Sequence, residues 1–338
     1  MRSKRLGPIT VISTDSRVGS RIVLNQGTGR RGREFAKSAL HGLFRSGQRL
    51  RVDILPRHFY SAIPDVRDLT VNDSWRVPSS MPGVRGTDID EQFSTLASWF
   101  SARVLEALAA KDVYDAAVTA NGALGYGPAE AQILHAFVAS VRPRRVVQVG
   151  AGVSTAVILG AASKHETETR VTCVDPFPTE YLRVLADRGE IELIAENAQS
   201  VALETFTDLA DGDLLFIDST HTVKPGSEVN RIILEVLPRL ARGVMVHFHD
   251  ITFPYDYQRD VLDRALFFWC ESTLLHAFLA GNDRVRVLMS GSMLQYARAD
   301  DLRRIIPRFD PRDHDRGLDV EGDLRDFAGC TYLLVDGD

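Results

Sequence analysis

The residues of this sequence with the clearest chemical potential are a glycine turn and an acid 25 positions after it. Gly150 and Gly152 follow the apolar, β-branched run 145–149 and precede a helix-compatible segment. Glycine has no Cβ and adopts positive φ at little cost, so this turn lets the backbone approach a bound nucleotide or nucleoside. A second β-rich run, 170–174, ends at Asp175. A carboxylate at the end of the second strand of a βαβ unit is placed to accept hydrogen bonds from ribose hydroxyls.

The turn lacks the third glycine of the dinucleotide fingerprint, because Thr155 stands three residues after Gly152. That glycine permits close packing of helix and strand beside a pyrophosphate. NAD, FAD and S-adenosylmethionine are all compatible with a glycine turn paired with an acid. The missing glycine favours the ligand without a pyrophosphate, S-adenosylmethionine, over a dinucleotide.

Polar residues also follow three later β-rich runs, near 190–194, 213–217 and 243–248. They are Glu196 and Asn197 after the first run, Asp218 and His221 after the second, and His249 and Asp250 after the third. In open α/β sheets, ligands bind beyond the carboxyl ends of the strands. We therefore expect one site at this edge of the sheet, with Glu196 or Asn197 near an adenine.

A parallel sheet is needed to bring these residues together. The strand-like runs alternate with helix-compatible segments, which predicts repeated βα units. Val285–Met289 and Thr331–Val335 are expected to close the sheet. The fold class is α/β: a Rossmann-like, doubly wound, mainly parallel seven-stranded sheet with an antiparallel C-terminal strand and an N-terminal extension. Helices are predicted over Glu34–Phe44, 93–108, 129–141 and 258–279.

Two domains are expected, an N-terminal extension over 1–120 and the nucleoside-binding domain over 121–338. Residues 56–92 are rich in Pro, Asp, Ser and Gly and predict a long loop that could act as a lid. His58 and Tyr60 on this loop either fold over the site or anchor packing. Asn121 and Tyr126, among glycines, are candidates for a substrate-side or cofactor-side loop.

Composition is that of a soluble globular chain of 338 residues, and no apolar run reaches the length of about 18 residues that spans a bilayer. The N-terminus has no apolar signal core, and three scattered cysteines do not form a disulfide framework, so we expect a cytoplasmic protein. Residues 1–60 carry 13 Lys/Arg against 3 Asp/Glu. Without interleaved aromatics, this basic arm favours packing on the acidic body of its own or a partner chain over nucleic acid. The aromatic run 267–269, on the predicted helix, suits a core or a homodimer face.

The ordered motifs Gly-x-Gly-x-Ser-Thr, Val-Asp-Pro, Phe-Ile-Asp-Ser-Thr-His and His-Phe-His-Asp-Ile resemble those of class I S-adenosylmethionine-dependent methyltransferases. Within that class they are similar to a bacterial branch often found with sugar and natural-product O-methyltransferases. The likeness covers about 121–295 and extends back to 58–64. One departure is Gln148, where the first motif usually carries an acid.

The resemblance implies residue roles, which we state as expectations. The cofactor S-adenosylmethionine would contact a set of residues at the strand ends: Gly150, Gly152, Ser154, Asp175, Glu196, Asn197 and Asp218. In catechol-type relatives, a carboxylate after the fourth strand and a pair after the fifth bind magnesium. Asp218, His249 and Asp250 occupy those metal positions here, and His221 occupies the position of the base. The expected catalytic residues are His221, Asp218 and His249.

These roles suit methyl transfer, an in-line displacement at a sulfonium that depends on positioning and on deprotonating the nucleophile. Histidine suits the base because its unperturbed pKa lies near 6.5, although His221 could instead cap the following helix. The sequence predicts O-methylation of a small polar, sugar-like or natural-product acceptor. Two alternatives stay open: a cyclase or lyase that releases methylthioadenosine, and a non-catalytic binding module on the same scaffold.

Overall fold

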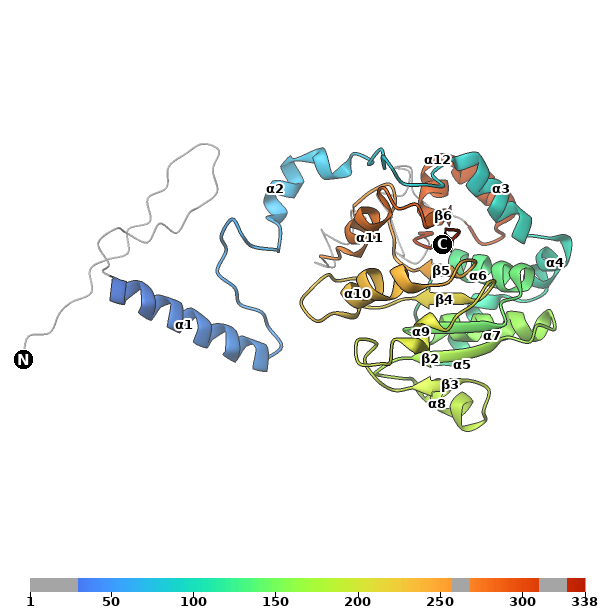
Figure 1. Ribbon diagram of the computed structural model, residues 1–338, viewed down its shortest axis with the longest axis horizontal. Coiled ribbons are helices and arrows are strands. Elements are labelled where there is room, and N and C mark those ends of the chain that lie inside the picture. Colours follow the sequence, from blue (N-terminus) through green and yellow to red (C-terminus); the bar gives the residue numbers. More distant parts are fainter. Residues whose placement is uncertain (1–29, 257–267, 310–326, 338) are drawn as a thin grey trace, which may run out of the picture. The chain divides into compact units, whose positions relative to one another are not determined.

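The computed structural model describes residues 30–256, 268–309 and 327–337, and the chain divides into two compact units, 1–64 and 65–338 (Figure 1). In the first unit, α1 (Arg30–Arg49) is a basic helix that exposes Leu40 and Leu43. It covers the predicted helix Glu34–Phe44 and extends beyond both ends. The rest of the basic arm lies outside the described residues. Among the described helices, none combines the length and the apolar character needed to cross a bilayer.

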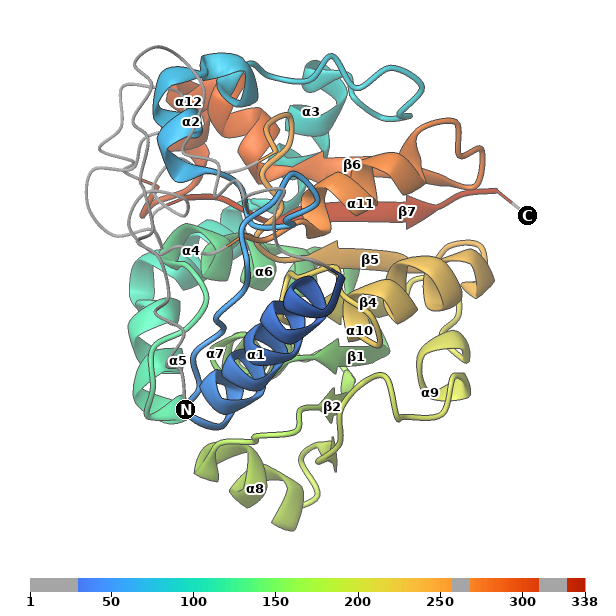
Figure 2. The same ribbon diagram turned by 90° about the vertical axis from the view of Figure 1, so that its left-hand side faces the viewer.

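In the second unit, seven strands form one sheet in the order β3-β2-β1-β4-β5-β7-β6, which is visible from bottom to top in Figure 2 from β2 onward. Their bounds are β1 (Arg145–Val149), β2 (Arg170–Val174), β3 (Glu192–Ile194), β4 (Leu214–Ile217), β5 (Met245–Phe248), β6 (Val285–Ser290) and β7 (Thr331–Val335). The first five strands pair in parallel, and β7 runs antiparallel between β5 and β6. The predicted sheet, including its antiparallel C-terminal strand, is confirmed.

The central strands are buried on both faces, because successive side chains point to opposite sides of the sheet. Val146 and Phe216 pack into one core with α6 and α7, whereas Val147 and Leu215 pack into a second core with α10 and α11. This explains why these strands read as continuous apolar runs rather than as alternating ones.

The helices of the second unit begin upstream of the sheet and then alternate with its strands. Their bounds are α2 (Val66–Val71), α3 (Ile89–Trp99), α4 (Ala102–Ala110), α5 (Val113–Asn121), α6 (Pro128–Val141), α7 (Val153–Lys164), α8 (Glu180–Asp187), α9 (Glu204–Thr207), α10 (Glu228–Arg231), α11 (Glu271–Leu279) and α12 (Gly291–Ile305). Short helical turns η1 (Asp73–Arg76), η2 (Ile232–Val236) and η3 (Leu237–Arg239) accompany them.

Three sequence predictions about helices were wrong in part. The single helix over 93–108 is two helices, because Ser101 accepts a hydrogen bond from the Val104 N–H and starts α4. The predicted loop 56–92 contains α2, whose N-terminus is capped by the Asp65 carboxylate. In the described part of 258–279, α11 begins only at Glu271 and residues 268–270 are not helical, so the described part of the run 267–269 lies outside a helix. The remainder, 257–267, lies outside the described residues.

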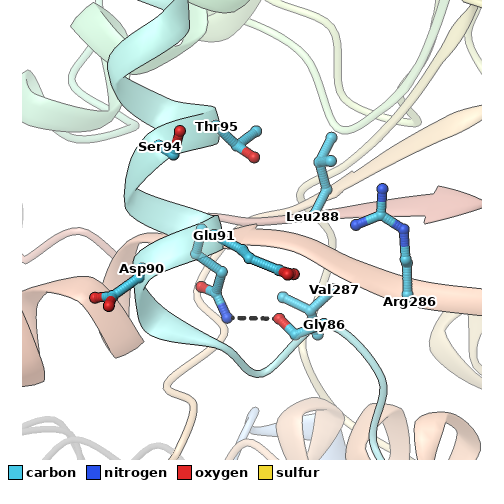
Figure 3. A pocket seen from close by; sticks show the side chains of 9 residues that line it. Gly86, Asp90, Glu91, Ser94, Thr95, Arg286, Val287 and Leu288 are labelled. Carbon is cyan, nitrogen blue, oxygen red and sulfur yellow. Dashed lines mark hydrogen bonds between the residues drawn. The ribbon is translucent and has the colours of Figure 1, made fainter.

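The outer edge of the sheet is covered by the chain upstream of α3. The Val287 N–H donates to the Arg85 carbonyl. The Gln92 side chain donates to the Gly86 carbonyl, the bond drawn as a dashed line at Gly86 in Figure 3. The Gln92 carbonyl oxygen accepts from the Ser290 N–H. A surface pocket of about 440 Å³ lies over this edge. The Gln92 amide therefore blocks part of an edge that could otherwise pair with another strand.

Candidate active site

The glycine turn joins the ends of β1 and β4. A Cβ added at Gly150 would lie 1.8 Å from the backbone oxygen of Asp218, and φ of Gly150 is +79°. Both facts require glycine at this position. The Asp218 N–H donates to the Val149 carbonyl, 2.8 Å away, which fixes the same two strand ends together. Gly150 therefore sets how closely the ends of β1 and β4 approach each other.

Asp175 lies against the glycine turn. One carboxylate oxygen accepts from the Ala151 N–H at 3.1 Å, and the other accepts from the Phe177 N–H at 2.7 Å. The residue is half-buried at the rim of the sheet. Two backbone donors thus hold the carboxylate in one orientation while part of it remains open to solvent.

A buried polar network lies beneath the turn. The Gln148 amide donates to the Ser154 hydroxyl at 3.1 Å and accepts from the Thr155 hydroxyl at 2.8 Å. The Thr155 hydroxyl also accepts from the Gly152 N–H. Gln148, in place of the usual acid, ties β1 to the first turn of α7. Ser154 is buried in this network, so its hydroxyl belongs to the support of the turn, and its predicted contact with a cofactor stays a prediction.

The other predicted cofactor-side residues differ in surroundings. Asn121 ends α5 beside Gly152, and its carbonyl oxygen accepts from the Thr179 hydroxyl at 3.0 Å. Glu196 and Asn197 follow β3 and are exposed. Their contact with an adenine stays a prediction.

The predicted lid residues His58 and Tyr60 belong to the unit 1–64. Both are exposed, and the Tyr60 N–H donates to the His58 ring nitrogen at 3.1 Å. This local bond shapes the turn that carries them. Their role over the site stays a prediction.

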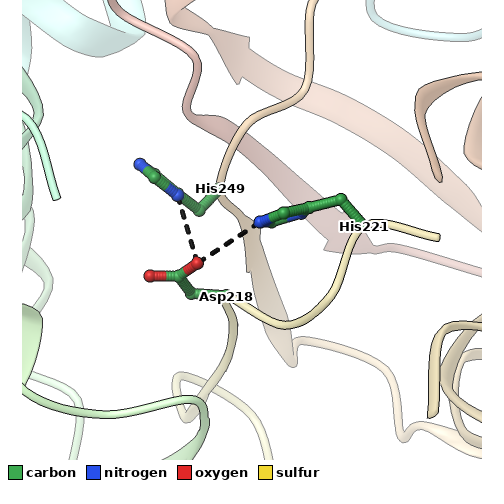
Figure 4. A group of neighbouring side chains, drawn as sticks. All are labelled: Asp218, His221 and His249. Atoms are coloured by element: carbon green, nitrogen blue, oxygen red, sulfur yellow. Dashed lines mark hydrogen bonds and ion pairs between the residues drawn. The ribbon is translucent and has the colours of Figure 1, made fainter. Parts of the chain in front are cut away.

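The ends of β4 and β5 bring together a cluster of two imidazoles and two carboxylates, of which Figure 4 shows Asp218, His221 and His249. His249 Nδ1 lies 3.2 Å from Asp218 Oδ1 and 3.4 Å from Asp250 Oδ2. His221 Nε2 lies 3.5 Å from each of the same two oxygens. We call these four residues the strand-end cluster. The imidazoles are buried, whereas the two carboxylates are about a quarter exposed, so the cluster opens toward solvent through its acids.

Two buried glutamates that the sequence reasoning missed hold the far side of each imidazole. Glu271 Oε2 lies 2.8 Å from His221 Nδ1, and Glu130 Oε2 lies 3.0 Å from His249 Nε2. Burial raises the pKa of both carboxyls, and the partner imidazole counteracts that rise. One signal was available for Glu130, because α6 is apolar on nearly all sides and offers this acid no solvent face.

The electrostatics of the strand-end cluster favour charged groups despite burial. Burial disfavours the imidazolium of His221, but hydrogen bonds to Asp218 and Glu271 and the charge of Asp250 outweigh it and raise its pKa to about 10. Burial also opposes charging of His249, yet Asp250 and the other carboxylates around it raise its pKa well above the usual range. Burial works against ionised Asp218 as well, and the two imidazoles hold its pKa well below the usual range.

Aromatic rings flank the two imidazoles. The Tyr126 ring lies 4.9 Å from the His249 ring, and its hydroxyl lies 3.3 Å from His247 Nε2. The Trp269 ring lies 4.9 Å from that of His221. Burial, and then the charge of His249, lower the pKa of His247 well below its usual range, so His247 is a neutral strand histidine. Tyr126 is buried beside it, and its expected contact with a substrate stays a prediction.

Three residues of this region adopt left-handed backbone conformations without being glycine. The φ angles are +60° at Tyr126, +55° at His221 and +54° at Asp250. Such conformations cost energy and persist where the surrounding structure enforces them, often at functional sites. For His221, the N–H groups of Cys270 and Glu271 both donate to its backbone carbonyl and hold the turn.

Comparison with known proteins agrees with this geometry. Residues 147–251 match the family model of a methyltransferase domain. An uncharacterized protein of Archaeoglobus fulgidus is 25% identical over 191 residues, which are 52% of this chain and 80% of that protein.

One similar solved structure is that of the O-methyltransferase TomG of Streptomyces achromogenes, determined with S-adenosylmethionine. It is 16% identical with a TM-score of 0.40, and the match covers 67% of this chain and 91% of that one. A methyltransferase of Podospora anserina bound to S-adenosylhomocysteine is 13% identical with a TM-score of 0.34, covering 55% and 82%. The matched segment 147–251 runs from β1 to the end of β5 and holds the glycine turn, Asp175 and the strand-end cluster. Over this segment the chain therefore carries a methyltransferase domain, of the class I, S-adenosylmethionine-dependent type.

Proposed function

We propose that this protein is an O-methyltransferase, which moves the methyl group of S-adenosylmethionine to a hydroxyl group of a small polar, sugar-like or natural-product acceptor. The observation that carries the proposal is the strand-end cluster, which adjoins the glycine turn through the contact of Gly150 with the Asp218 backbone. A hydroxyl is a poor nucleophile near neutral pH, so its methylation requires a group that removes the proton. A packed core alone has no use for two imidazoles and two acids at this point.

On the cofactor side, the glycine turn and Asp175 hold the nucleoside. The turn lets the backbone approach the ligand, and the Asp175 carboxylate accepts hydrogen bonds from the ribose hydroxyls. The Ala151 and Phe177 N–H groups fix the orientation of that carboxylate before the cofactor binds. Glu196 or Asn197, exposed after β3, contacts the adenine.

On the acceptor side, His221 is the base. The acceptor oxygen attacks the methyl carbon, the carbon–sulfur bond breaks and its electron pair neutralises the sulfonium, which leaves S-adenosylhomocysteine. The proton of the hydroxyl goes to His221 Nε2. The pKa of His221 is about 10 in the ligand-free protein, so the imidazole is charged near neutral pH. A positive sulfonium brought toward Asp218 offsets the charge of that carboxylate, lowers this pKa and frees Nε2 to accept a proton.

The strand-end cluster also fits a divalent cation, which the resemblance to catechol-type relatives implies. Asp218, His249 and Asp250 would hold it, and His221 Nε2 is within reach as a further donor. The four distances between an imidazole nitrogen and a carboxylate oxygen of the cluster are 3.2, 3.4, 3.5 and 3.5 Å. Two imidazoles suit a borderline ion better than magnesium. Such an ion would lower the pKa of a hydroxyl bound to it.

The proposal is tested by binding and by product analysis. Radiolabelled S-adenosylmethionine should bind to the full chain, and incubation with a panel of small sugars, phenols and other alcohols should yield S-adenosylhomocysteine and a labelled ether. Release of methylthioadenosine instead would indicate the cyclase or lyase. Binding of polyanions without any turnover would indicate a non-catalytic module, and absence of cofactor binding would end the proposal.

A further inference from the structure

We propose that Glu130 and Glu271 are a matched pair of positioning residues, which turn one nitrogen of each imidazole toward a single point between Asp218 and Asp250. The consequence for catalysis rests on the proposed function above. The geometric claim stands without it. Neither glutamate is part of the sequence motifs that mark the domain, and they lie on different helices, α6 and α11.

Each glutamate contacts one nitrogen of its imidazole, and the contacted nitrogen differs between the two rings. Glu271 binds Nδ1 of His221 and leaves Nε2 directed at the acids, whereas Glu130 binds Nε2 of His249 and leaves Nδ1 directed at the acids. An ionised carboxylate only accepts hydrogen bonds, so each glutamate fixes an N–H on the nitrogen that it contacts. The opposite nitrogens of the two rings then face the same pair of carboxylate oxygens.

Both glutamates stand in the first turn of their helices. Glu271 is the first residue of α11, and Glu130 follows Pro128 at the start of α6. The positive end of the helix dipole stabilises an acid at such a position. The start of α11 holds His221 twice, through the Glu271 side chain and through two backbone N–H groups that donate to the His221 carbonyl.

Stability does not explain these acids. Glu130 is 2% and Glu271 is 1% exposed, and the Oε1 atom of each finds no hydrogen-bond partner among the described residues. A buried carboxylate with an unpaired oxygen is costly, and replacing a whole buried ion pair by apolar residues of similar size is often neutral or stabilising, although removing one partner alone destabilises the fold. Partners that orient the imidazole ligands of metal sites act in the same way, and their loss typically lowers metal affinity or activity about 10–100-fold.

The test compares Glu130→Leu, Glu271→Leu and the two glutamine variants with the wild type and with Asp213→Asn. Asp213 is an equally buried carboxylate at the opposite end of β4, where it accepts from the Arg145 and Ala210 N–H groups. Full-length protein labelled with ¹⁵N-histidine and bound to S-adenosylhomocysteine is observed for low-field, exchange-protected imidazole N–H protons. Thermal unfolding and the dissociation constant of S-adenosylhomocysteine are measured on the same samples.

The wild type should give one such signal from each N–H that faces a glutamate, Nδ1–H of His221 and Nε2–H of His249. Glu271→Leu should remove the signal of His221 and retain that of His249, and Glu130→Leu should do the reverse. The glutamine variants should retain both signals because the amide oxygen still accepts. Asp213→Asn should retain both signals even though it loses stability. Both signals surviving in the leucine variants, or both vanishing in Asp213→Asn, would overturn the proposal.

Turnover separates this proposal from the proposed function. With the panel of sugars, phenols and alcohols, S-adenosylhomocysteine formation should fall about 10–100-fold in each leucine variant, while cofactor affinity stays within about twofold, both measured at a temperature at which the variant remains fully folded. A loss of rate that merely follows a loss of stability would contradict a positioning role. A wild type without turnover would contradict the proposed function alone, because the N–H signals still report the geometry.

Discussion

Two aspartates at the same rim of the sheet, Asp175 after β2 and Asp218 after β4, are held in different ways. Asp175 accepts from two backbone N–H groups within the turns next to it. Asp218 is bound by two imidazoles, which are in turn held by glutamates 50 and 119 residues away in sequence. The half of the rim that we propose for the cofactor is therefore built by local main-chain geometry, and the half that we propose for the acceptor by side chains from distant elements.

This difference separates binding from chemistry. Backbone N–H groups cannot be removed by changing a side chain and do not titrate, so the orientation of Asp175 does not depend on the protonation of another side chain. The strand-end cluster concentrates charge, and its protonation depends on each member. Substitutions in the two halves should therefore have different signatures, and four experiments can distinguish them.

The largest effect is expected where the halves meet. Gly150→Val places a side chain against the Asp218 backbone at a positive φ, so it should destabilise the fold by at least about 3 kcal/mol and abolish cofactor binding. Chemical denaturation and isothermal titration with S-adenosylmethionine measure both quantities. Gly189→Ala is the control, because Gly189 has a φ of +69° with open space around it. It should cost about 1 kcal/mol and leave binding intact.

The second effect tests the acceptor half alone. His221→Ala should lower turnover about 10²–10⁴-fold, the usual range for a proton-transfer group, while cofactor affinity does not fall. Steady-state rates at saturating cofactor, combined with titration, separate the two quantities. Near wild-type turnover would show that His221 is not the base. An equal loss of binding would show that the two halves are not separate.

The third effect is a loss of cofactor affinity, rather than of turnover, on the proposed cofactor side. Asp175→Ala removes the carboxylate proposed to bind the ribose, so cofactor affinity should fall about 10–100-fold, as expected for lost hydrogen bonds to a charged group. Turnover at saturating cofactor should change only a few-fold. Titration and rate measurements on the same preparation give both values. Unchanged affinity would remove Asp175 from the cofactor site.

The smallest effect concerns pH. The pKa of His221 is about 10 in the folded chain and near 6.5 when unfolded, so the charged imidazole stabilises the fold fully below pH 6.5. That stabilisation is lost as the pH rises toward 10. Between about pH 8 and pH 9.5 the wild type should lose about 2 kcal/mol more than His221→Asn in unfolding experiments. Parallel curves for the two proteins would contradict the charged state of His221.

The sheet was predictable because its strands are short apolar runs that end in polar residues. All seven predicted strands lie within a few residues of the observed bounds, from Arg145–Val149 to Thr331–Val335. Helix boundaries were less predictable where a cap decides them, as at Ser101, because a single hydroxyl interrupts an otherwise continuous apolar pattern. The start of α11 at Glu271 was missed for the opposite reason: the described residues 268–270 before it are helix-compatible, but the Cys270 N–H donates to the His221 carbonyl instead of continuing a helix.

The candidate site was predictable in part for the same reason. Residues directly after a strand share one edge, which brings Asp175, Asp218 and His249 to it. Glu130 and Glu271 lie inside helices, and no spacing in the sequence relates them to the imidazoles that they bind. Sequence patterns reveal the residues directly after a strand, whereas the partners that hold those residues depend on how the helices pack.

The left-handed backbones of Tyr126, His221 and Asp250 have a consequence for engineering. At each position, glycine would relieve the unfavourable φ, and at two of them it would also delete a member of the strand-end cluster. Selection for thermal stability alone would therefore replace these residues early, and activity would be lost as stability rose. Thermostable descendants should be sought only under simultaneous pressure to retain catalysis.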